Sequence, residues 1–81
     1  MTQPDARALV LRCLGEIAPE ADLEALPPGA DVREALDLDS MDFFNLVAAL
    51  SEGSGAAIPD VDAPQLTSLD GAATYLAVHA P

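Results

Sequence analysis

Apolar residues recur along the first part of the chain with the spacing of a helix. Between residues 4 and 18 they fall at positions i, i+3/i+4 and i+7, which places them on one face. This first stripe consists of Ala6, Leu9, Val10, Cys13, Leu14 and Ile17. Thr2 is a suitable N-cap with Asp5 three residues later, as in a capping box, and Pro19 ends the helix near Ala18.

A second, more apolar helix is predicted from about Ser40 to Ser51. Asp39 is a good N-cap for it, and the run of residues 53–55, Gly-Ser-Gly, terminates it. Its apolar residues form two neighbouring faces. One face holds Met41, Phe44, Val47 and Ala48, and the other holds Phe43, Leu46 and Leu50. Because so much of its surface is apolar, we expect this helix to be largely surrounded by its partners.

A long connection, residues 19–38, separates these two helices. It contains a Pro-Pro-Gly sequence at residues 27–29, and residues 33–36 are expected to form a helical turn. Its apolar residues should hold it against the core. These anchors are Leu23, Leu26, Val32 and Leu36.

Two further helical segments are predicted in the last third of the chain. Asp60 or Asp62 can cap a short helix, and residues 67–70 form another capping pattern before a final helix. The short helix holds Ala63 and Leu66, and the inner face of the final helix holds Leu69, Ala72, Ala73, Leu76 and Ala80. No stretch shows the alternation of a strand, so the fold is predicted to be all-α.

The net charge of the chain excludes some classes of function. The 81 residues, enough for one small domain over 1–81, carry 14 acids against 3 arginines and no lysine, a formal charge of -11. Such a chain repels nucleic acid and favours partners with basic surfaces. Cys13 has no second cysteine to pair with and is expected to be a small buried residue. With neither an apolar signal region nor a stretch long enough to span a membrane, a cytoplasmic protein is expected.

Ser40 is the one residue whose position suggests chemistry. A hydroxyl at the start of a helix lies where unpaired N–H groups and the helix dipole favour an attached phosphate. The sequence provides nothing to activate it as a nucleophile: the only histidine is His79, and lysine is absent. The nearby acids do not form a calcium loop, because its sixth and twelfth positions, counted from Asp37, are Asp42 and Ala48 rather than Gly and Glu. Serine is also an ordinary residue at a helix start, so position alone leaves both a modified serine and a plain cap or first-turn residue open. We expect no catalytic residue and no metal site.

These features together resemble a known family. The run Asp-Ser-Met-Asp at residues 39–42 is similar to the Asp-Ser-Leu motif of the acyl carrier proteins, whose serine receives 4′-phosphopantetheine. Ile-Pro-Asp at 58–60 resembles the entry to that family's short third helix. Tyr-Leu at 75–76 falls where the family's last helix often carries an aromatic residue followed by an aliphatic one.

The resemblance implies a four-helix bundle with a short third helix and a long first loop, and a monomer. It implies that Ser40 carries 4′-phosphopantetheine covalently, attached by a separate phosphopantetheinyl transferase. The terminal thiol of the arm would hold acyl groups as thioesters for fatty-acid, polyketide or related specialised biosynthesis. Further partners would be acyl-loading, ketosynthase or acyltransferase-type enzymes with basic docking surfaces. The alternatives are a peptidyl or aminoacyl carrier, and an acidic helical interaction module that is never modified.

The chain departs from the family beside the serine. The family often has glycine two residues before the aspartate of the motif or next to it, where this chain has Asp37 and Leu38. Many fatty-acid carriers have further acids after the motif, whereas this chain has Phe43, Phe44 and Asn45. We expect Phe43 near the exposed side, in a docking surface more apolar than usual, so that Phe43→Glu impairs a cognate partner more than the transferase. The predicted partner-recognition residues are Asp37, Asp39, Met41, Asp42, Phe43 and Asn45.

Overall fold

The computed structural model describes residues 1–81 and contains helices and loops without strands. In chain order the elements are α1 (Gln3–Ile17), η1 (Leu23–Ala25), α2 (Val32–Ala35), α3 (Ser40–Ser54), η2 (Asp60–Leu66) and α4 (Leu69–His79), where η marks a 3₁₀ helix. The predicted all-α fold is confirmed. The four predicted helices correspond to α1, α3, η2 and α4, so the third is the short one.

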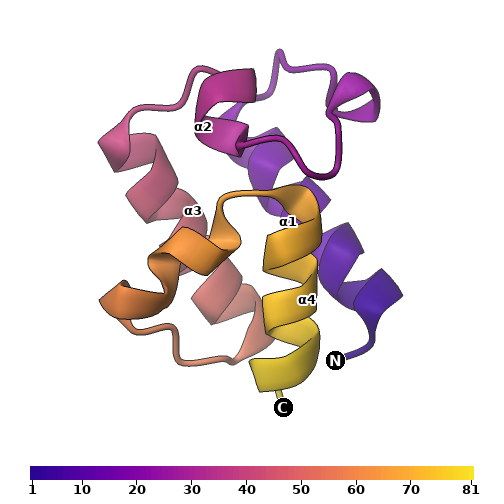
Figure 1. Ribbon diagram of the computed structural model, residues 1–81, viewed down its shortest axis with the longest axis vertical. Helices are drawn as coiled ribbons and strands as arrows, with labels where there is room; N and C mark the ends of the chain where they lie inside the picture. Colours follow the sequence, from indigo (N-terminus) through magenta and orange to yellow (C-terminus); the bar gives the residue numbers. More distant parts are fainter.

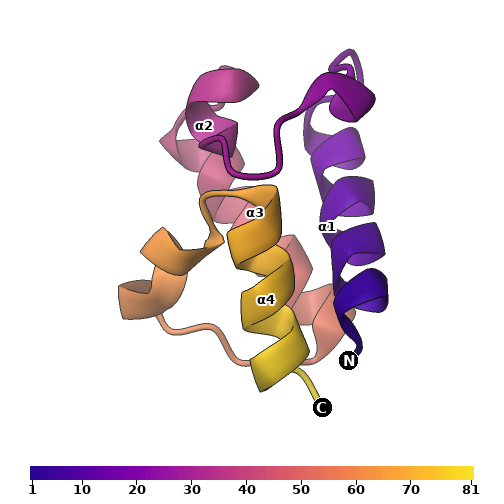
Figure 2. The ribbon, with the colours of Figure 1, turned by 45° about the vertical axis from the view of Figure 1, so that its right-hand side comes forward.

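The three long helices pack around one core (Figures 1 and 2). α1 contacts both α4 and α3, and η2 lies beside α4. The predicted inner faces of α1 and α4 are buried, except that Ile17 is half-buried. The largest fully buried side chains are Leu14, Leu46, Leu50, Leu66, Leu69, Leu76, Val10 and Val32. No helix is both long enough and apolar enough to cross a membrane.

The connection between α1 and α3 is held against the bundle, as the sequence predicts. Leu26 and Val32 are buried, and residues 32–35 form the single turn α2. Two backbone hydrogen bonds join this connection to the chain around the start of α4. The N–H of Val32 donates to the carbonyl of Thr67 at 2.7 Å, and the N–H of Asp70 donates to the carbonyl of Pro28 at 3.0 Å.

The second helix ends at the predicted Gly-Ser-Gly run but continues three residues past Ser51, its predicted last residue. α3 continues to Ser54 because only Gly55 adopts the left-handed conformation that stops it, with φ of 78°. The Ser54 hydroxyl is satisfied inside the last turn: it donates to the Leu50 carbonyl at 2.6 Å and accepts from the Ala56 N–H at 3.1 Å. This bonding lets a polar residue be buried at the end of the helix.

The predicted cap of the short helix is also wrong. Pro59 occupies the N-cap position of η2, and neither Asp60 nor Asp62 caps it through its side chain. Asp62 instead accepts a hydrogen bond from the Tyr75 hydroxyl at 2.7 Å. The carboxylate therefore connects η2 to α4, a long-range role that local capping patterns do not reveal.

Gly71 allows η2 and α4 to approach closely. A Cβ at this position would lie 2.8 Å from the backbone oxygen of Gln65, whereas a Cβ at Gly15 in α1 would meet nothing closer than Leu23 Cδ1 at 3.7 Å. We expect Gly71→Ala to lower the free energy of unfolding by about 1–3 kcal/mol despite alanine's better helix propensity. The matched substitution Gly15→Ala should raise it by up to about 1 kcal/mol. Urea denaturation of both variants measures this; equal effects would contradict the close approach.

Electrostatic repulsion is largely uncompensated in this fold. The single ion pair joins Arg7 Nη1 to Asp70 Oδ1 at 3.6 Å, with both side chains substantially exposed. Because the net charge is -11, salt should screen mutual repulsion and raise the melting temperature. Thermal unfolding between about 0.01 and 0.5 M sodium chloride checks this. A melting temperature that stays flat over that range would count against it.

Candidate functional site

The start of α3 is fixed by a reciprocal capping box. The N–H of Asp42 donates to Asp39 Oδ1 at 2.8 Å, and the N–H of Asp39 donates to Asp42 Oδ2 at 3.4 Å. Ser40 is therefore the first residue of a well-defined helix. Asp37, just before this start, has a φ of 54°, a left-handed conformation that glycine adopts at less cost.

Ser40 differs from the other three serines of the chain in exposure and bonding. Ser51 donates to the Ala56 carbonyl at 2.6 Å, Ser54 is buried, and Ser68 accepts from the N–H of Gly71 at 2.9 Å. Ser40 alone is exposed, and its hydroxyl makes no hydrogen bond within the protein. It is thus the serine that another protein can reach without breaking a structural contact.

The surroundings of Ser40 provide no base to activate it. His79, two residues from the C-terminus, contacts Tyr75 with 4.2 Å between the ring centroids and a tilt of 34°. The carboxylates of Asp39 and Asp42, next to Ser40, are used in the capping box. Cys13 is buried as predicted, and burial is the main cause that raises the pKa of its thiol. No group of three or more metal-ligating side chains occurs. Ser40 thus has no hydrogen-bonded base beside it in this structure.

The face of α3 that begins at Ser40 is apolar and exposed. Met41 and Phe44 expose 66% and 65% of their surface, and on η2 Val61 exposes 83%. The expectation that neighbouring elements largely surround this helix is therefore wrong for this face. The helical period explains which residue is exposed: Phe44 lies four residues after Ser40 and so on the same side of the helix.

Phe43 does not occupy the exposed position expected for it. Its side chain is half-buried and packs against the hydrophobic core. The guanidinium of Arg33 lies over its ring, 5.5 Å from the centroid. Phe43 shares its side of α3 with the buried Leu46 and Leu50, so the residue that faces solvent beside Ser40 is Phe44.

A groove between α3 and η2 begins at Ser40 and has a volume of about 470 Å³. It is lined by Ser40, Phe43, Phe44, Val47, Ala48, Ser51, Ile58, Asp60 and Ala63. Six of these nine residues are hydrophobic, and the stretch of α3 from Ser40 to Ser51 is about 16 Å long at 1.5 Å per residue. The groove is therefore apolar and long enough to shelter an extended apolar chain.

The predicted recognition residues line more than one hollow. Asp39 and Met41 line a shallow hollow with Ser40 and Phe44. Asp37 and Asp42 instead line a different hollow that does not include Ser40. Asn45 is exposed but lines neither. Phe44 could have been found from its helical spacing to Ser40, whereas Ile58 and Ala63 join the groove only through tertiary packing.

The Tyr75 hydroxyl fixes the η2 wall of this groove, and we expect its titration to report the contact. The hydrogen bond to Asp62 is the main cause that raises the pKa of Tyr75, with burial and the negative charge of Asp62 adding to it. Since the folded state favours the protonated phenol, its stabilising contribution is complete below about pH 10 and is lost as the pH rises through the folded pKa. Tyr75 is the only tyrosine and tryptophan is absent, so absorbance at 295 nm follows it directly. The midpoint should lie above that of a free tyrosine amide and fall in Asp62→Ala; an unchanged midpoint in the variant would contradict the contact.

The amino-acid sequence matches one protein family and several known proteins, all described as carriers or as a phosphopantetheine attachment site. The family described as "Phosphopantetheine attachment site" matches residues 8–76. The chain is 33% identical over 76 residues to "Acyl carrier protein" of Rubrobacter xylanophilus, covering 90% of this chain and 94% of that protein. It is 35% identical over 75 residues to "Acyl carrier protein" of Syntrophobacter fumaroxidans, covering 90% and 93%. It is also 30% identical over 76 residues to "Putative acyl carrier protein, mitochondrial" of Schizosaccharomyces pombe, covering 94% and 68%.

Proposed function

The chain belongs to the phosphopantetheine-attachment family of acyl carrier proteins, and we propose that Ser40 is its attachment residue. Members of this family carry intermediates on phosphopantetheine, and the chain is a carrier protein rather than an enzyme. The exposure and bonding of Ser40 support this assignment, because it is the one exposed serine and its hydroxyl makes no hydrogen bond. It also lies at the start of a capped helix and lines an apolar groove.

The residues at the start of α3 suit a covalently bound phosphodiester. The Ser40 hydroxyl is free, and the first turn of a helix favours a negative group by about 0.3–1 kcal/mol. Attachment forms a bond from Ser40 Oγ to phosphorus and breaks the pyrophosphate bond of coenzyme A, which releases 3′,5′-ADP. The hydroxyl proton passes to a base of the transferase, because this chain offers none. Once bound, phosphopantetheine supplies a thiol that holds an acyl group as a thioester.

The groove between α3 and η2 is where we place the acyl cargo. Phe44, Val47 and Ile58 contribute apolar surface to it, and its length along α3 starts at the attachment point. The core itself is already filled by buried leucines, so cargo would lie along this groove unless the helices separate. We propose that this cargo is an acyl group of fatty-acid, polyketide or related specialised biosynthesis.

The proposed partners are a phosphopantetheinyl transferase and acyl-loading, ketosynthase or acyltransferase-type enzymes. Members of this family work with biosynthetic enzymes, and the acidity of the chain favours basic docking surfaces on them. We place the partner contact on Asp39, Met41 and Phe44, around Ser40.

We also propose that residues 1–81 act as one carrier domain, as a monomer in the cytoplasm. The relative from Schizosaccharomyces pombe, by contrast, is named as mitochondrial.

Intact-mass measurement tests the proposed function. The protein is incubated with coenzyme A, magnesium and a broad-specificity transferase, and its mass should rise by that of one phosphopantetheine group. Loading of an aminoacyl rather than an acyl group onto the product would favour the peptidyl carrier. A chain that stays unmodified with several transferases would favour the unmodified acidic interaction module.

A further inference from the structure

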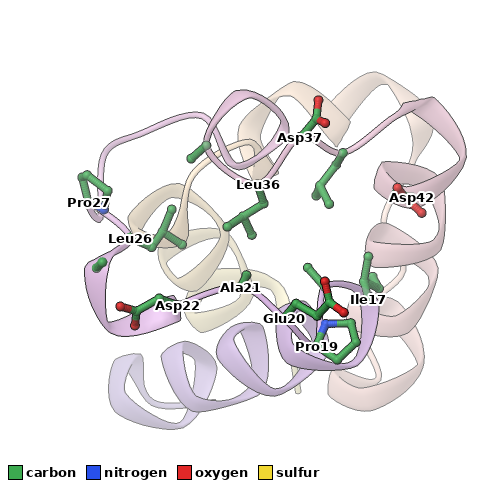
Figure 3. Close-up of a pocket in the computed structure, with 14 residues that line it drawn as sticks. Ile17, Pro19, Glu20, Ala21, Asp22, Leu26, Pro27, Leu36, Asp37 and Asp42 are labelled. Carbon is green, nitrogen blue, oxygen red and sulfur yellow. The ribbon is translucent and has the colours of Figure 1, made fainter.

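A second groove, which Ser40 does not line, lies between the end of α1, the connection that follows it and the start of α3 (Figure 3). We call it the loop groove. Its volume is about 740 Å³, and neither Ser40, Met41 nor Phe44 lines it. Residues from three places in the sequence form it: 17–22, 25–27 and 35–38, with Asp42 from α3. The proposed attachment chemistry leaves this groove without a role.

The floor of the loop groove is apolar. Leu26 and Leu38 are buried, while Ile17 and Leu36 are half-buried and so keep part of their side chains open to the hollow. In Figure 3 the side chains of Leu26 and Leu36 lie toward the middle of the hollow. This floor could accept an aliphatic side chain from another molecule.

The edge of the loop groove is acidic. Glu20, Asp22, Asp37 and Asp42 lie around it, as Figure 3 shows. No arginine lines the groove, and the only ion pair of the protein joins Arg7 and Asp70 elsewhere. The carboxylate of Asp42 accepts the N–H of Asp39, but those of the other three have no hydrogen-bond or ion-pair partner in the protein. An apolar floor inside unpaired carboxylates is complementary to a cationic amphipathic surface.

The loop groove is formed before any partner binds. Pro19 and Pro27 restrict its connecting segment, and the hydrogen bonds of Val32 and Asp70 tie the neighbouring backbone to the remainder of the bundle. A partner would therefore avoid much of the entropic cost of ordering this segment.

We propose that the loop groove docks a basic amphipathic segment of a partner protein. An aliphatic side chain of that segment lies on Ile17 and Leu36, and its lysines or arginines reach Glu20 and Asp22. Nucleic acid and anionic lipid are disfavoured as occupants because they carry the same sign of charge as the edge. Since Ser40 lies outside the groove, this docking does not require phosphopantetheine, and it can orient a partner independently of the arm.

The test uses the full unmodified chain, labelled with ¹⁵N, and a synthetic peptide built from repeats of Lys-Leu-Leu-Arg. Amide shifts on titration should concentrate in residues 17–27 and 35–38. A peptide with glutamine in place of lysine and arginine, and one with serine in place of leucine, should each bind at least about tenfold more weakly. Shifts centred on Met41 and Phe44, or equal binding of the uncharged peptide, would overturn the proposal.

Two matched pairs of variants separate the groove from general acidity. The double variant Glu20→Lys with Asp22→Lys should weaken binding of the peptide about tenfold. The double variant Glu16→Lys with Glu52→Lys makes the same change of charge outside the groove and should change the binding affinity less than about threefold. Ala35→Trp fills the groove from an exposed position, and Ala8→Trp is its exposed control outside it. Equal weakening within either pair would contradict the proposal. Loading at Ser40 is measured separately by mass, so failure of one proposal is distinguishable from failure of the other.

Discussion

Replacing Ser40 by alanine is expected to abolish the attachment of phosphopantetheine while leaving the fold intact. The loss should be at least about a thousandfold in the rate of transfer from coenzyme A, because the nucleophilic oxygen itself is removed. The free energy of unfolding should change by less than about 0.5 kcal/mol, because Asp39 and Asp42 cap the helix without help from the Ser40 side chain. Intact mass reports the loading and circular dichroism reports the fold.

The other serines provide the control for this experiment. Ser51→Ala removes a hydroxyl that also lines the α3–η2 groove but is bonded to the Ala56 carbonyl. It should load at the wild-type rate once the folded fraction is taken into account. Loading that persists in Ser40→Ala and disappears in Ser51→Ala would reassign the attachment point.

Replacing Phe44 by glutamate is expected to impair a cognate partner enzyme by about thirtyfold or more in kcat/KM. Phe44 is 65% exposed beside Ser40, and exposed aromatic residues that become buried in an interface often contribute about 2 kcal/mol or more to binding. Loading by a broad-specificity transferase should fall much less, because such an enzyme accepts many carriers. Since the side chain packs against little of its own protein, the fold should survive.

Asn45→Glu is the matched control for Phe44→Glu. It is the adjacent exposed position and adds the same charge, so it separates loss of the aromatic ring from electrostatic effects. Equal impairment by both variants would contradict an apolar anchor at Phe44. Phe43→Glu is less informative than the sequence suggests, because Phe43 is half-buried under Arg33 and its replacement also destabilises the core.

The sequence predicts the helices well where their apolar faces are long and regular. The stripes of α1 and α4 are buried nearly as predicted, and Asp39 caps α3 as the local pattern indicates. These features depend on residues within one or two turns of each other. Such short-range chemistry can be read directly from a sequence.

The predictions that fail depend on contacts between distant segments. Asp62 bonds to Tyr75 rather than capping η2, and no local pattern encodes that partner. Whether Phe43 or Phe44 faces solvent depends on which side of α3 meets the core, and both residues are equally apolar.

The attachment point is tested most directly by fragmentation mass spectrometry of the wild-type protein isolated from its native host. The sequence of the chain assigns each fragment, so the modified residue is located without any substitution. We expect one phosphopantetheine group, with or without an acyl chain on its thiol, on the fragment that contains Ser40 and on no other serine. A group on Ser51, Ser54 or Ser68, or a chain that is unmodified in a host with an active transferase, would contradict the account.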